Sequence, residues 1–154
     1  MTIRRISSGP GLPAGLPFSL ASEYNGVLYI SGMPSLDSEG RFAPGTFEQE
    51  AERAWANITA IAAASGYTSD EFLYVQVLLV EIGNYGDVND WWRRQFPDPA
   101  ATPSRLTFQA GALPFGAKIE HKLSTHTTGK ETRRRIRYRS AARRRLGVYA
   151  GWIA

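Results

Sequence analysis

The chain has 154 residues, no cysteine and only two histidines, His121 and His126. Without cysteine there is no disulfide framework, no thiol nucleophile and no cysteine-ligated zinc site. Two histidines five residues apart, with no acid between them, make a poor metal site and support no Ser-His-Asp triad. We therefore expect no metal site, a side chain of His121 that packs in the core, and a reducing compartment, the cytoplasm.

Long hydrophobic runs are also missing. No stretch reaches the roughly 20 apolar residues that cross a bilayer, and the start, MTIRRISSGPG, lacks the apolar run of a signal peptide. The glycines of SGPGLPAGLP alternate with prolines and do not form a strand-to-helix phosphate loop, so nucleotide binding has no support. We expect a soluble protein with no membrane partner.

The net charge of +4 averages two unlike parts of the chain. Residues 1–129 hold nine basic and thirteen acidic residues, a net charge of −4, whereas residues 130–154 hold nine basic and one acidic, a net charge of +8. This break predicts one domain over residues 1–124 and a basic extension over 125–154, which we expect to be disordered. Its clustered arginines attract phosphate backbones, so it is interpreted either as a nucleic-acid-binding segment or as a solvated extension without a partner.

Hydrophobic patterning predicts two helices and at least four strands. Thr46 and Gln49 form a capping-box pattern at the start of the first helix, and Gly66 suits its end. Asn84 and Asp87 form a cap pattern at the start of the second helix. The helices are predicted at 46–66 and 84–96, and the strands at 25–32, 72–82, 104–110 and 117–123, with at least one more strand possible before residue 25.

This order of elements indicates an α+β fold, a mixed sheet with two helices on one face. The strand at 72–82 is apolar on both faces apart from Gln76, as expected of a central strand covered on both sides. Two helices cover only one face of such a sheet. Oligomerisation is the economical way to cover the other face.

The last two strands carry the candidate chemistry. Alternation places Arg105 and Thr107 on one face of their strand, and Glu120 on the polar face of the next strand. A guanidinium fits a carboxylate with two hydrogen bonds, so Arg105 is a candidate anchor for an acidic small molecule, and Glu120 is suited to hold or activate a water. The same pattern also fits an ion pair between Arg105 and Glu120 on a solvated sheet face, and spacing alone does not decide.

An ordered set of motifs over residues 6–123 resembles the Rid (YjgF/YER057c/UK114) family of enamine and imine deaminases. The motifs include the arginine, the following Leu-Pro and the closing Lys-Ile-Glu, all at the family's spacing. In chain order they are LPFSLA at 16–21, VLYISG at 27–32, ERAWANITAIAAASG, the pair Val88 and Asn89, PSRLTFQAGALP and KIE at 118–120.

The resemblance implies a chorismate-mutase-like fold and a homotrimer with three sites in clefts between subunits. It implies that Arg105 binds the substrate carboxylate and that Glu120 orients the attacking water. The substrates would be enamines like 2-aminoacrylate and their imine tautomers, hydrolysed to a 2-keto acid and ammonia with no cofactor. Phe18, Ser31, Gly32, Asn89 and Thr107 would contact the substrate in the same cleft, although Ser31 and Asn89 equally fit strand-end and helix-capping roles.

Four positions depart from the family's usual pattern. Phe18 stands in place of tyrosine, Met33 in place of glutamine, Thr107 in place of cysteine, and Ala112 in place of arginine. These changes leave the two charged site residues in place and alter their surroundings. A divergent substrate, or a sensor that binds small carboxylates without turnover, therefore stays open beside the deaminase and a ribonuclease-like module.

Overall fold

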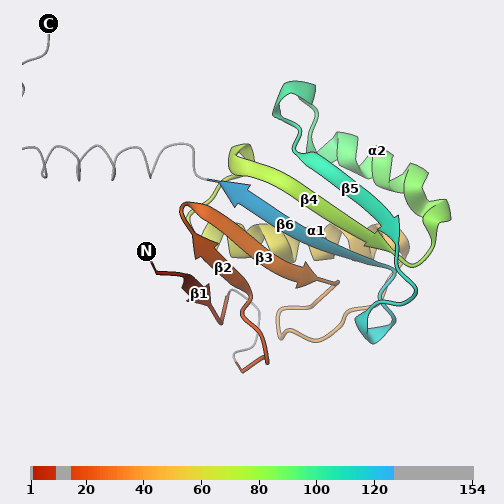
Figure 1. The fold of residues 1–154 in the computed structure, drawn as a ribbon. Coiled ribbons are helices and arrows are strands. Elements are labelled where there is room, and N and C mark those ends of the chain that lie inside the picture. Colours follow the sequence, from red (N-terminus) through yellow and green to blue (C-terminus); the bar gives the residue numbers. More distant parts are fainter. Residues whose placement is uncertain (1, 10–14, 127–154) are drawn as a thin grey trace, which may run out of the picture.

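The computed structural model describes residues 2–9 and 15–126. They form a six-stranded mixed sheet with two α-helices on one side, as Figure 1 shows. This confirms the α+β class, and two strands precede residue 25 where at least one was anticipated. The elements are β1 (Arg4–Ile6), β2 (Ala21–Tyr24), β3 (Val27–Met33), α1 (Phe47–Ala64), β4 (Phe72–Leu79), α2 (Tyr85–Gln95), β5 (Ser104–Gln109) and β6 (Ile119–His126).

The strands follow the order β1-β2-β3-β6-β4-β5 across the sheet. Only β4 and β5 run parallel, and α2 makes the crossover between them. The last strand in the chain, β6, lies between β3 and β4 and is antiparallel to both. The strand that carries Glu120 is therefore central, and the strand that carries Arg105 lies at an edge of the sheet.

Helix α1 begins and ends where its sequence predicts. Thr46 and Gln49 form the capping box, with the Thr46 hydroxyl accepting from the Gln49 N–H and the Gln49 side chain accepting from the Thr46 N–H. In its first turn the helix buries the carboxylate of Glu50, which accepts hydrogen bonds from the Lys118 N–H and ammonium, each at 2.8 Å, and from the Gly45 N–H. Glu50 thus ties α1 to the chain that enters β6.

The start of α2 differs from the prediction. Asn84 occupies the N-cap position, but its side chain makes no capping hydrogen bond, because a turn of 3₁₀-helix (Ile82–Asn84) leads directly into the helix. The cap predicted from Asn84 and Asp87 is therefore wrong in its side-chain contact.

Aromatic rings fill the space between the two helices and the sheet. Trp55 of α1 lies at the centre, and it contacts Trp91 edge-on at 5.4 Å between ring centres. His121 of β6 is fully buried and stacks on Trp91 at 4.9 Å, which confirms its predicted packing role. Such edge-on and offset contacts stabilise aromatic cores beyond the area they bury. The other rings around Trp55 belong to Phe72, Trp92 and Phe96.

Within the described residues, nothing covers the face of the sheet opposite the helices. Tyr29 of β3 is 53% exposed, and Leu106 and Phe108 of β5 are 45% and 39% exposed. Apolar groups of this size on one face indicate a contact surface. No helix within residues 2–9 and 15–126 is long and apolar enough to span a membrane. The first two residues of the predicted basic extension, 125 and 126, form the end of β6, and its remaining residues, 127–154, lie outside those that the structure describes.

Candidate active site

Arg105 extends from β5 to the helix side of the sheet and lies against α2. Its Nη2 donates a hydrogen bond to Asn89 Oδ1 at 2.5 Å. The centre of its guanidinium lies 5.0 Å from the ring centre of Trp92 and 5.7 Å from that of Tyr85, which are cation–π contacts. One hydrogen bond and two rings thus hold the guanidinium in a fixed place.

The fixed guanidinium keeps one unused donor. Nη1 of Arg105 is buried and has no hydrogen-bond partner among the described residues. The hydroxyl of Thr107, two residues further along β5 and on the same face, is buried and unpartnered in the same way. A buried polar group without a partner is costly, and a charged donor more so. The pair is suited to an acceptor from outside this chain, such as a carboxylate.

Glu120 lies on the opposite face of the sheet, packed onto Gly32. A Cβ atom added to Gly32 would come within 1.8 Å of Glu120 Oε1, so only glycine leaves room for this carboxylate. The pairing of β3 with β6 shifts register between Ile30 and Met33, which places a β-bulge at this contact. Burial raises the pKa of Glu120, and the nearby Lys122 partly offsets the rise. A raised pKa makes this carboxylate a better proton acceptor than a fully solvated one.

Two other predicted residues border the Glu120 side. The Ser31 hydroxyl donates to the Ser19 carbonyl at 2.8 Å, which is the structural role left open for it. Phe18 precedes Ser19 directly and is 50% exposed. This hydrogen bond joins the Phe18–Ser19 segment to β3 directly beside Gly32.

The register of the sheet separates Arg105 from Glu120. Arg105 pairs with Val75 of β4, whereas Glu120 pairs with Leu78, three residues further along the same strand. With strands about 4.8 Å apart and a rise of about 3.4 Å per residue, the two backbones lie about 14 Å apart, and the side chains leave opposite faces. The ion pair considered from the sequence is therefore wrong, because the two polar stripes do not share a face.

The predicted site residues accordingly fall into two half-sites. The arginine half-site consists of Arg105, Thr107 and Asn89, and the glutamate half-site consists of Glu120, Gly32, Ser31 and Phe18. The capping role considered for Asn89 is wrong, since its side chain accepts from Arg105. No cluster of three or more potential metal ligands occurs in the described part of the chain.

Sequence reasoning missed the part that two aromatic residues play in the arginine half-site. Tyr85 and Trp92 flank the guanidinium, and neither is among the site residues predicted from the sequence. A signal was present, because Tyr85, Asn89 and Trp92 recur at spacings of four and three and so share one face of α2. Nothing in the sequence indicated that this face meets Arg105.

The family model described as Endoribonuclease L-PSP matches residues 11–126, a span that holds both half-sites. The chain belongs to this family, which is the Rid family that its motifs resemble. Among its Rid relatives, a mouse protein named 2-iminobutanoate/2-iminopropanoate deaminase is 33% identical over 120 residues, which cover 77% of this chain and 87% of the relative.

Solved structures agree with the Rid assignment. A putative endoribonuclease from Thermotoga maritima superposes with a TM-score of 0.74 and 26% identity, covering 82% of this chain and 99% of that one. Yeast Mmf1 shares the fold with a TM-score of 0.75 at 23% identity, covering 82% of this chain and all of the other. The family model ends at residue 126, so residues 127–154 lie outside its match.

Proposed function

We propose that this Rid protein hydrolyses reactive enamines and imines, such as 2-aminoacrylate and its imine tautomer, to 2-keto acids and ammonia. The observation that carries the proposal is the buried, unpartnered Nη1 of a guanidinium that Asn89, Tyr85 and Trp92 hold in place. A carboxylate there replaces a missing hydrogen bond with a charge-assisted one. The names of the relatives, such as 2-iminobutanoate/2-iminopropanoate deaminase, support this reaction.

The proposed site lies between protomers of a homotrimer. One substrate cannot reach both Arg105 and Glu120 of a single chain, because the two side chains leave opposite faces of the sheet about 14 Å apart. A site that uses both therefore takes Arg105 from one protomer and Glu120 from its neighbour. The exposed apolar residues on the open face, Tyr29, Leu106 and Phe108, supply the contact surface for such an assembly.

The proposed chemistry needs little beyond orientation. The carbon of an imine is already electrophilic, so Arg105 fixes the substrate by its carboxylate while Glu120 takes a proton from the attacking water. Glu120 returns that proton to the imine nitrogen, which gives the carbinolamine. Glu120 then carries the carbinolamine hydroxyl proton to the amine as the C–N bond breaks, so that ammonia leaves and a 2-keto acid remains. One water is consumed and no electrons change hands.

The test generates the imine in place, with an amino-acid oxidase acting on an L-amino acid, and follows release of the 2-keto acid. Arg105→Lys keeps the charge but loses the planar fork, so KM should rise by roughly 10- to 100-fold. Glu120→Gln should lower kcat and leave KM nearly unchanged. Arg93→Ala, an exposed arginine of α2 paired with Asp90, serves as the control and should change neither. Binding of a 2-keto acid without turnover would instead identify a sensor.

Nucleic-acid binding through the basic extension is a separate proposal from the sequence. Because the net charge of residues 1–129 is −4, a phosphate backbone would meet its counter-charge beyond them. Nucleic-acid binding that survives deletion of residues 130–154 would show that the domain, and not the extension, is responsible for it.

The cytoplasm is the proposed location, since the chain carries no cysteine.

A further inference from the structure

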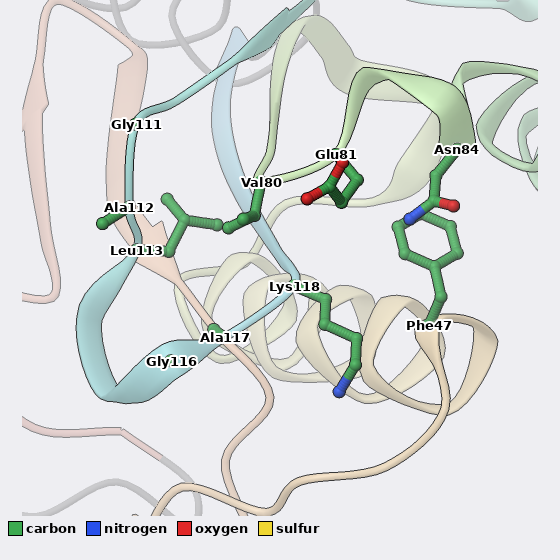
Figure 2. Close-up of a pocket in the computed structure, with 10 residues that line it drawn as sticks. All are labelled: Phe47, Val80, Glu81, Asn84, Gly111, Ala112, Leu113, Gly116, Ala117 and Lys118. Atoms are coloured by element: carbon green, nitrogen blue, oxygen red, sulfur yellow. The ribbon is translucent and has the colours of Figure 1, made fainter.

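A cavity lined by neither Arg105 nor Glu120 lies at the carboxyl ends of the parallel strands β4 and β5. Its volume is about 450 Å³. Crevices at the carboxyl ends of parallel strands are frequent ligand sites, because the chains that leave neighbouring strands diverge there. The lining residues come from the chain after each strand, from the start of α1 and from the chain entering β6 (Figure 2): Phe47, Val80, Glu81, Asn84, Gly111, Ala112, Leu113, Gly116, Ala117 and Lys118.

The walls of this cavity are mostly apolar. Figure 2 shows the side chains of Val80 and Leu113 against each other on one side and the ring of Phe47 on the other, with the aliphatic stem of Lys118 between them. Neither Arg105 nor Glu120 lines the cavity. An occupant therefore needs a hydrocarbon body, and it contacts neither of the two charged residues of the proposed deaminase site.

One charged side chain of the cavity, the exposed Glu81, has no partner among the described residues. The carboxylate of Glu81 makes no ion pair or side-chain hydrogen bond with the part of the chain that the structure describes. The ammonium of Lys118 is turned away from it and is engaged by Glu50 Oε1 at 2.8 Å and by the Gly45 carbonyl at 2.9 Å. The Asn84 side-chain amide also lines the cavity and makes no capping hydrogen bond.

We propose that this cavity binds a small primary ammonium compound with an apolar body. The ammonium group meets the Glu81 carboxylate and donates a second hydrogen bond to the Asn84 side-chain oxygen. The hydrocarbon packs on Phe47, Val80 and Leu113. An anion does not fit, because Glu81 repels it and Glu50 already neutralises the one cation in the wall. A branched five-carbon amine is a suitable probe, since its chain matches the apolar walls and its head carries the required charge.

The test measures binding of isoamylamine to the full-length protein by saturation-transfer NMR at pH 7, with isoamyl alcohol as the uncharged analogue. Saturable binding of the amine is expected with a dissociation constant on the order of 1 mM, as for a ligand of six heavy atoms. The alcohol and the Glu81→Gln variant should each weaken binding about fivefold, the value of one partly exposed ion pair. Val80→Phe fills the space and should abolish it.

The matched control is Asp70→Asn. Asp70 is an exposed carboxylate just before β4, whereas Glu81 lies just after it, so both changes remove one negative charge at opposite ends of one strand. Asp70→Asn should leave the affinity unchanged. The proposal is overturned if the amine does not bind, if Glu81→Gln binds it as well as the unmodified protein does, or if Asp70→Asn weakens it equally. Thermal melting confirms that each variant is folded, and the deaminase assay is not involved in any outcome.

Discussion

Replacing Gly32 by alanine should disable the glutamate half-site without unfolding the protein. The added methyl group would lie 1.8 Å from Glu120 Oε1 and 2.7 Å from its Cδ, far inside any real carbon contact. The carboxyl group must therefore move by more than about 1 Å. A displacement of this size at a reacting group typically costs about 100-fold in rate. Because Gly32 does not have a positive φ, alanine adds no backbone strain.

The kinetic pattern distinguishes displacement of Glu120 from general damage. With the Arg105 side of the site intact, Gly32→Ala should lower kcat about 100-fold and change KM for an imine substrate less than threefold. Gly83→Ala is the control, since a Cβ there meets nothing within 4 Å. Thermal melting checks the fold of both variants. Full activity in Gly32→Ala would refute the role given to the Gly32–Glu120 contact.

Three further predictions concern stability. Gly86→Ala in α2 should raise the free energy of unfolding by about 0.5 kcal/mol in urea titrations, because its Cβ meets open space and alanine favours helix; a loss would contradict this. Burial lowers the pKa of His121 to about 4, so the unfolded chain binds the proton more readily and stability should fall by about 3 kcal/mol as pH drops from 6.5 to 4. In His121→Phe, which keeps the stacking on Trp91, that part of the slope should vanish. Glu50→Gln leaves the Lys118 ammonium without its anion and should cost about 2 kcal/mol in the same titrations, whereas no loss would make the contact dispensable.

Local features of the fold could be predicted from the sequence. Which face of the sheet each polar stripe occupies could not. The capping box of Thr46 and Gln49 could be predicted because both residues belong to the same helix turn, three positions apart in the sequence. Alternation sorted Arg105 from Leu106 correctly, but only the tertiary packing determines which of the two meets α2. The interpretation of Arg105 and Glu120 as an ion pair was wrong for this reason.

Partners far apart in the chain account for most of what the sequence left open. Glu50 looks like one of several helix carboxylates, and its burial depends on Lys118, which lies 68 residues away. The capping role of Asn84 was wrong because a 3₁₀ turn precedes the helix. The contact of Tyr85 with Arg105 depends on how α2 lies over β5.

Hybrid trimers test most directly whether Arg105 and Glu120 of different protomers form one site. Arg105→Ala and Glu120→Ala proteins, each inactive alone, are unfolded together, refolded at equal ratio and assayed for imine hydrolysis. In a ring of three head-to-tail interfaces, a quarter of the sites receive both native side chains, so activity should recover to roughly 25% of the unmodified level. If the mixture is no more active than either variant alone, the two residues act within one chain or not together, and the account is contradicted.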